Sequence, residues 1–284
     1  MHLQSVAENP QRDTDPGRLG LVDSNVFVGR ASGVPWARNF EVSSRDVLAE
    51  MSRVGVDGAV AYHVLAREYS PRLGNGLLLD EIAGQPALAG AWILLPHHTG
   101  EFPPPAALIP EMAAAGVVMA RMHPSTDPSA HRYLLADWVV GELLEALADA
   151  GFPLAIDFSL FRRAEPPWEL LFQVLNTHPL LKVLLMDVQG RNNRTLYPLL
   201  ERFPNLTIQT AGLNVHRGIE DVVSRFGADR LIFGSGYPLR SMGAARFGLD
   251  TAEIAETDRR LIGAGNLTSL LGPRAADRFG ATHA

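Results

Sequence analysis

Apolar runs and amphipathic stretches alternate along most of the chain. Eight short runs are rich in apolar residues, and most of them lack polar alternation, which is typical of strands covered on both faces. They lie at residues 19–28, 58–63, 88–94, 116–122, 153–158, 182–186, 206–210 and 230–234. The stretches between them have the length and periodicity of helices, and Gly or Pro often stands where a helix must stop. We therefore predict a repeated unit of strand followed by helix.

The first predicted helix has clear ends. Ser43 or Ser44 can cap a helix that runs from about Asp46, and apolar residues follow at helical spacing. Gly55 stands just past the last of them, where a glycine commonly ends a helix before the next strand. The sequence therefore predicts both where this helix begins and where it stops.

The number and spacing of the units predict a closed barrel. Residues 19–272 leave about 32 residues for each of eight units, which matches a (β/α)8 TIM barrel of roughly 250 residues. An open doubly wound sheet is the alternative, but VGRASGVPW follows the first strand where a G-x-G-x-x-G turn would be expected. We predict a single-domain α/β barrel over residues 19–284, preceded by a flexible arm over residues 1–18.

Composition excludes several classes of protein. The chain has 284 residues, 46% of them hydrophobic, and no Cys, so disulfide scaffolds, cysteine zinc sites and thiol nucleophiles are ruled out. A formal charge of -6 without a dense basic run argues against a nucleic acid partner. We find no signal peptide and no apolar run of the ~18 residues that a membrane helix needs, so we expect a cytoplasmic protein. Lys182, the single lysine, begins a strand, which disfavours Schiff-base catalysis.

Polar side chains gather where the predicted strands end. In a barrel of this kind the chemistry takes place at the carboxyl ends of the strands. There we predict residues that bind a small-molecule substrate: Asn25, His63, Arg121, His123, His216 and Tyr237. For each histidine the alternative is a loop residue in solvent, since no pair has a tight ligand spacing such as H-x-H.

Two carboxylates stand out because each interrupts an apolar strand. Asp157 lies in PLAIDFS and Asp187 in VLLMDVQG, and they end consecutive strands, which lie roughly 4.8 Å apart in a sheet. If both face the barrel mouth, one pKa should rise while the other stays low, which suits a proton donor beside a base. We predict that these two residues are catalytic. The alternative is that each is bound to backbone amides or to an arginine, for which Arg121, Arg162 and Arg191 are candidates.

The order of these elements, together with several segments, resembles the amidohydrolase-related family of metal-dependent hydrolases and decarboxylases. The segments are LVDSNVFVG at 21–29, VVMARMHP at 117–124, PLAIDFS at 153–159, VLLMDVQG at 183–190, FPNLTIQTAG at 203–212, FGADRLIFGSGYP at 226–238 and GNLTSLLG at 265–272. The resemblance covers nearly all of the chain after residue 18. It implies the barrel fold and hydrolytic or decarboxylating chemistry.

The resemblance also implies a divalent metal, but the residues at the ligand positions differ. Members of the family use an H-x-H on the first strand, a His on the fifth and an Asp on the eighth, while a His on the sixth handles protons. Here Asn25 and Phe27, Asp157, Asp187 and Gly236 stand at these positions. Because Phe27 and Gly236 offer no donor side chain, we predict no cofactor and that the family zinc is absent.

Three functions follow from these residues. The first is a hydrolase that acts on a small polar lactone, ester or amide by carboxylate acid and base chemistry, without zinc. There Asn25 would position the substrate, and Arg121 or His63 would stabilise negative charge. The second is an inactive relative that only binds a small molecule. The third is a decarboxylase or hydrolase whose divalent metal is held by the oxygens of Asn25, Asp157 and Asp187. A homodimer is our expectation for the assembly, though no sequence feature determines it.

Overall fold

Eight parallel strands, joined in chain order, form the central sheet of the computed structural model, which describes residues 20–32, 41–125, 131–161 and 164–279. A short ninth strand, β2, pairs antiparallel with the end of β1 and was not predicted from the sequence. The strands are β1 (Val22–Arg30), β2 (Glu41–Val42), β3 (Gly58–His63), β4 (Leu88–Ile93), β5 (Met119–Met122), β6 (Leu154–Asp157), β7 (Val183–Met186), β8 (Leu206–Gln209) and β9 (Leu231–Ile232). Each of the eight predicted runs therefore coincides with a strand, although β1 extends two residues beyond the run at 19–28.

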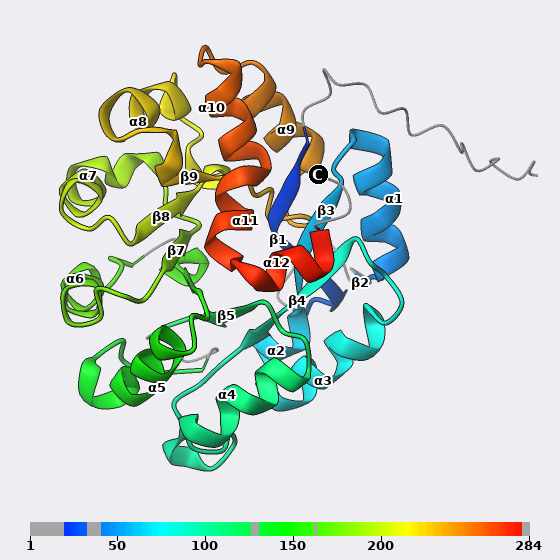
Figure 1. Ribbon diagram of the computed structural model, residues 1–284, viewed down its shortest axis with the longest axis vertical. Coiled ribbons are helices and arrows are strands. Elements are labelled where there is room, and N and C mark those ends of the chain that lie inside the picture. The colour runs from blue at the N-terminus through cyan, green and yellow to red at the C-terminus, as the bar shows by residue number, and fades with distance from the viewer. Residues whose placement is uncertain (1–19, 33–40, 126–130, 162–163, 280–284) are drawn as a thin grey trace, which may run out of the picture.

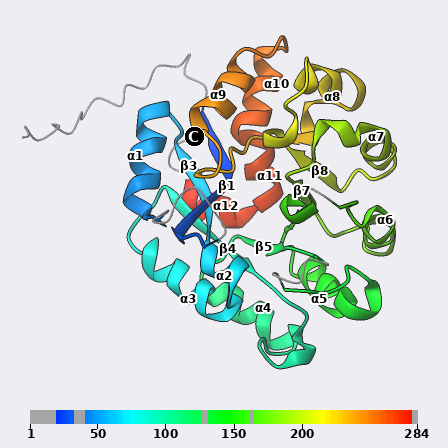
Figure 2. The ribbon, with the colours of Figure 1, turned by 180° about the vertical axis from the view of Figure 1, so that it is seen from behind.

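Helices follow the strands and surround them. Figure 1 shows α4 to α8 in an arc outside the strands, and Figure 2 shows the same arc from behind. The helices are α1 (Ser44–Val54), α2 (Val64–Glu68), α3 (Pro71–Glu81), α4 (Pro105–Ala114), α5 (Asp137–Asp149), α6 (Trp168–Thr177), α7 (Asn193–Arg202), α8 (Gly218–Phe226), α9 (Met242–Asp250), α10 (Glu256–Arg260), α11 (Asn266–Leu271) and α12 (Pro273–Phe279).

Helix α1 begins and ends as its sequence predicts. Ser43 is the N-cap, its side chain accepts a hydrogen bond from the Asp46 amide, and the Asp46 carboxylate accepts one from the Ser43 amide at 2.9 Å. This reciprocal pair is a capping box. Gly55 ends the helix at φ 72°, in the left-handed region that glycine adopts without steric cost.

The barrel closes between β1 and the segment that follows β9. The Ser24 amide donates to the Phe233 carbonyl at 3.1 Å, the Phe27 amide donates to the Tyr237 carbonyl at 3.0 Å, and the Gly236 amide donates to the Asn25 carbonyl at 3.0 Å. The backbone groups on the two sides of this seam therefore pair across it. The chain is a (β/α)8 TIM barrel in one domain, as predicted.

Apolar side chains fill the part of the barrel interior that lies away from the carboxyl ends of the strands. One buried cluster combines residues on seven of the strands with the last two helices, α11 and α12, which lie across one end of the barrel in Figure 1. Its strand members are Val22, Val60, Ala89, Ala91, Met119, Ala155, Leu184, Met186 and Ile232. This layer is closely packed. A functional site is therefore expected at the opposite end of the barrel, where the strands have their carboxyl ends.

No helix in the described part of the chain is both long and apolar enough to cross a membrane. The predicted arm, residues 1–18, lies outside the described residues.

Candidate functional site

Polar side chains form the next layer of the barrel, above the apolar one. Successive side chains of a strand alternate between its two faces, so the residue two positions beyond an interior residue also faces the interior. Val60, Met119 and Ala155 are interior residues of the apolar cluster. Tyr62, Arg121 and Asp157 follow them by two positions, and all three are buried. The strand period therefore directs these three polar side chains into the barrel mouth.

Arg121 is the centre of this layer. Its Nη1 donates to Asn25 Oδ1 at 2.8 Å, and its Nη2 donates to Asp157 Oδ2 in a short ion pair. Its Cζ lies 4.1 Å from the centroid of the Tyr62 ring, within the range of a cation–π contact. Only 2% of the Arg121 side chain is exposed, so this charge is withdrawn from solvent and depends on these partners.

Asp157 is held as a carboxylate. Its Oδ1 accepts the Ser159 amide at 2.7 Å, and His123 Nε2 lies 3.3 Å from its Oδ2. Burial by itself raises the pKa of Asp157, but the charge of Arg121 and the neighbouring His123 and Ser159 side chains outweigh it and hold the pKa well below its usual value. Asp157 is therefore ionised at neutral pH. Its partner is Arg121, one of the arginines that the sequence analysis gave as the alternative to a catalytic role.

Asp187 lies directly after β7 and differs from Asp157 in its surroundings. Its backbone has φ 59°, a left-handed conformation that is uncommon for a residue other than glycine and costs energy. Arg240 forms an ion pair with its Oδ1. Burial and the negative charge of Asp157 raise the pKa of Asp187, and Arg240 only partly offsets them. Asp187 can therefore hold a proton at a higher pH than an ordinary aspartate.

His123 is buried beside this pair. Burial lowers its pKa to about 4, although the nearby Asp157 works in the opposite direction. Its Nδ1 has no hydrogen-bond partner within the described part of the chain. At neutral pH the ring is therefore uncharged and has a free nitrogen at the wall of the barrel mouth.

Three other residues predicted to bind substrate have different surroundings. His63 caps α2 by accepting the Leu65 amide on Nδ1 at 3.2 Å. Its ring lies so close to Gly29, at φ 95°, that a Cβ added to Gly29 would come within 2.6 Å of the ring.

His216 is exposed and lines a separate surface cavity near α7 and α8. The pKa of Tyr237 is raised by burial and by the carboxylates of Glu50 and Asp46, which belong to α1. We therefore leave these three side chains out of the candidate site.

The structure adds Arg67, Arg240, Tyr62 and Gln209, which the sequence analysis did not select. Arg67 lies in α2, and its charge acts on Tyr62, His123 and Asp157. Gln209 Oε1 accepts from Asn25 Nδ2 at 3.4 Å. Tyr62 and Gln209 are strand-end residues, so the rule that selected Asn25 could have found them. Arg67 and Arg240 lie in connecting segments, and their sequence neighbourhoods give no comparable signal.

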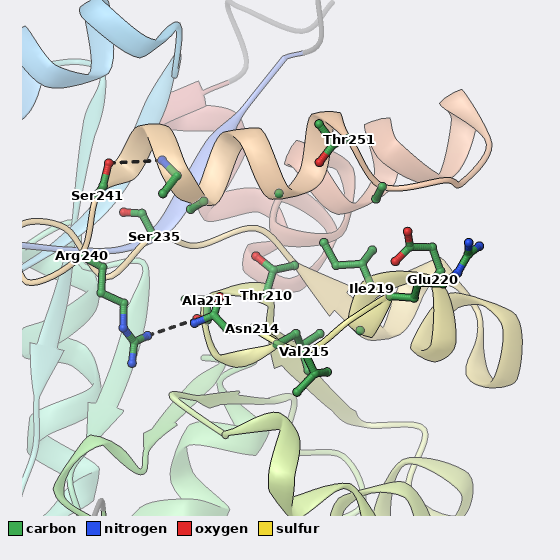
Figure 3. Close-up of a pocket in the computed structure, with 17 residues that line it drawn as sticks. Thr210, Ala211, Asn214, Val215, Ile219, Glu220, Ser235, Arg240, Ser241 and Thr251 are labelled. Atoms are coloured by element: carbon green, nitrogen blue, oxygen red, sulfur yellow. Dashed lines mark hydrogen bonds between the residues drawn. The ribbon is translucent and has the colours of Figure 1, made fainter.

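A cavity of about 540 Å³ lies beyond the carboxyl ends of β8 and β9. Figure 3 shows Arg240 and Ser235 on one side, Ile219 on the other and Thr210 between them, with α9 above. The walls also contain small and apolar residues, among them Leu213, Ile219, Ala244, Ala245 and Gly248. Its volume falls within the range of small-molecule sites. Arg240 both lines this cavity and pairs with Asp187, so it connects the cavity to the charged layer.

Ser235 is engaged in the barrel seam. Its amide donates to Asp23 Oδ1 at 3.0 Å, and its hydroxyl donates to Asp23 Oδ2 in a short hydrogen bond. The Asn25 amide donates to the same Asp23 Oδ1 at 2.9 Å. Burial raises the pKa of Asp23 to about 6, against the opposing effect of these hydrogen bonds. The serine hydroxyl therefore already has a structural partner.

Comparison with known families identifies one match, to the family described as Amidohydrolase, over residues 29–272. A comparison of the sequence with curated proteins finds no match.

Several solved structures share the fold. A dihydroxybenzoic acid decarboxylase from a Polaromonas species, with bound manganese and the inhibitor 2-nitroresorcinol, is 17% identical at a TM-score of 0.66, with 94% of this chain and 100% of that chain covered. A 2,6-dihydroxybenzoate decarboxylase from Rhizobium is 17% identical at 0.66, with 89% and 99% covered. A 5-carboxyvanillate decarboxylase from Novosphingobium aromaticivorans, with manganese, is 14% identical at 0.69, with 90% and 98% covered. At these identities the similarity establishes the fold alone.

Proposed function

This chain belongs to the amidohydrolase family, and from that premise we propose that it is an enzyme that removes carbon dioxide from a small aromatic carboxylic acid. One arrangement carries the proposal: Arg240 lines the 540 Å³ cavity and pairs with Asp187, whose pKa the charge of Asp157 raises. The substrate class is taken from those structural neighbours that are decarboxylases of such acids.

Arg240 is the group that binds the substrate carboxylate. While Asp187 holds a proton, the Arg240 guanidinium has no ionised partner in their pair, and an anion in the cavity can replace it. A guanidinium binds a carboxylate through two parallel hydrogen bonds, which orients the ligand as well as holding it. The aromatic ring then lies against the apolar part of the cavity wall, as is usual for small-molecule sites.

Asp187 is the proton donor. As the ring carbon that bears the carboxylate takes the Asp187 proton, the bond between that carbon and the carboxylate breaks. Its electron pair returns to the ring, and carbon dioxide leaves. Asp187 then takes a proton back from water. Asp157 assists from a distance, because its fixed negative charge keeps the pKa of Asp187 high.

Hydrolysis of a lactone, ester or amide is the second candidate, since the matching family is described as Amidohydrolase. In that reaction Asp187 would act as the base that takes a proton from the attacking water. The two candidates share the same residue and differ in product, so one set of assays separates them.

The test uses the full chain and two substrate panels. Hydroxybenzoic acids are assayed for carbon dioxide release, and lactones, esters and amides for acid release. We expect carbon dioxide release that falls on the order of a hundredfold or more in Asp187→Asn, because the proton donor is lost. Asp149→Asn, which changes an exposed carboxylate at the end of α5, is the matched control and should keep full activity.

Acid release without carbon dioxide would replace the first candidate with the second. Full turnover by Asp187→Asn would contradict the role of Asp187 in both.

A further inference from the structure

The three residues that the sequence offered as oxygen ligands for a divalent metal, Asn25, Asp157 and Asp187, each have an arginine partner. Asn25 Oδ1 and Asp157 Oδ2 both accept from Arg121, and Asp187 Oδ1 pairs with Arg240. Within the ranges that the structure describes, no group of three or more His, Asp or Glu side chains is arranged to hold a metal. The donors present therefore do not fit a divalent ion, although three of the structural neighbours hold manganese.

The position of the Arg121 guanidinium explains why. It joins Asp157 on β6 to Asn25 on β1, and these strands lie on different sides of the barrel, separated by β3, β4 and β5 in the sheet. The guanidinium consequently lies across the interior of the mouth, between oxygens that would otherwise face one another. The Tyr62 ring covers one of its faces at 4.1 Å.

We propose that Arg121 is the built-in cation of this site, and that its guanidinium occupies the place between β1 and β6 where a divalent metal ion would otherwise bind. A metal at these oxygens would lie within a few ångströms of a buried positive charge that cannot lose its proton. The same charge already neutralises Asp157, which removes the attraction that a metal would need. This inference concerns the binding of metal and does not depend on which reaction the enzyme catalyses.

The proposal predicts that a metal site can be created by removing the guanidinium. Wild-type protein is dialysed against a chelator, then titrated with Mn²⁺ while binding is followed by electron paramagnetic resonance and thermal unfolding. We expect no stoichiometric Mn²⁺ binding and no change in Tm for the wild type. In Arg121→Met the freed oxygens of Asn25 and Asp157 should bind Mn²⁺ at least tenfold more tightly than the wild type does, and Mn²⁺ should raise the Tm.

Two controls separate this effect from loss of a buried arginine in general. Arg230 is also buried, but its guanidinium donates to the backbone carbonyls of Leu200, Phe203 and Pro204. Arg230→Met should therefore lower the Tm without any response to Mn²⁺. Adding Asp157→Asn to Arg121→Met should abolish the gained binding.

One equivalent of Mn²⁺ bound by the wild type and lost in Asp157→Asn would overturn the proposal, and so would a folded Arg121→Met protein that gains no affinity for Mn²⁺. If Arg121→Met does not fold, the wild-type titration decides alone.

Discussion

Two aspartates end neighbouring strands of this barrel, each paired with an arginine, and yet their pKa values move in opposite directions. Asp157 and Arg121 are each only 2% exposed, whereas Asp187 is 12% and Arg240 29% exposed. Asp157 has Arg121, His123 and Ser159 as neighbours, and together they hold its pKa low. Asp187 has Arg240 as its ion-pair partner and Asp157 as a nearby like charge, and its pKa is raised. An ion pair alone therefore does not define the state of a carboxylate, because the number and sign of all nearby groups decide it.

Asp23 shows what burial does to a carboxylate in the same barrel when the hydrogen bonds it accepts come from neutral donors. It accepts from Ser235 and Asn25, and its pKa rises to about 6. Asp157 is as deeply buried but has Arg121. Arg121 is therefore the largest of the influences that keep Asp157 ionised. Asp157 carries a constant charge near neutral pH, whereas the charge of Asp187 can vary.

The largest expected effect is a loss of stability when the buried pair of Arg121 and Asp157 is broken. Arg121→Met leaves Asp157 buried without its counter-ion, so the free energy of unfolding should fall by about 3–5 kcal/mol. Arg240→Met removes a partly exposed partner and should cost about 1 kcal/mol or less. Urea denaturation of both variants measures the two values. Equal losses would show that the two pairs are energetically alike and would contradict the comparison.

A second test uses pH at Asp23. Because its pKa is about 6 in the folded state and 3.8 in the unfolded chain, the folded protein binds more protons between these values. The stabilisation by Asp23 is therefore complete below about pH 3.8 and is lost as the pH rises through 6. The unfolding free energy of the wild type, relative to Asp23→Asn, should fall by about 3 kcal/mol over this window. Denaturation curves at pH 4, 5, 6 and 7 measure this fall. If the difference in unfolding free energy between the two proteins stays constant or rises with pH, the pKa of Asp23 is not raised in the folded state.

The smallest expected effect is a shift in the pH dependence of the reaction when Arg240 is replaced. Arg240→Gln removes the cation that lowers the pKa of Asp187, so that pKa should rise further. If Asp187 donates the proton, the rate falls as the pH rises through its pKa, and in the variant this fall should move to higher pH. The pH dependence of kcat/KM, which reports the pKa values of the free enzyme, measures the shift. Arg225→Gln, which breaks an exposed pair with Asp221, is the control and should leave the profile in place.

The features that the sequence predicted well are those marked by a local pattern. The eight apolar runs coincide with the eight parallel strands, and the Ser43 cap and Gly55 end delimit α1 as predicted. Asn25, Arg121, His123, Asp157 and Asp187 all lie near the charged layer, because strand ends converge in a barrel. The same rule also selected His63, His216 and Tyr237, which lie near strand ends but have other surroundings. The predictions of a homodimer, a cytoplasmic location and an absent zinc stay predictions.

The sequence by itself determined the barrel, its strand order and the end of the barrel that holds the polar residues, because apolar period, capping and strand length act between residues close in the chain. Only the tertiary structure decided which aspartate received which arginine. Arg121 is 96 residues from Asn25 and 36 residues from Asp157, and it meets both only when the barrel closes. The charge on each carboxyl group then depends on distances through a dry interior, where a few ångströms change the interaction strongly. No pattern along the chain records those distances.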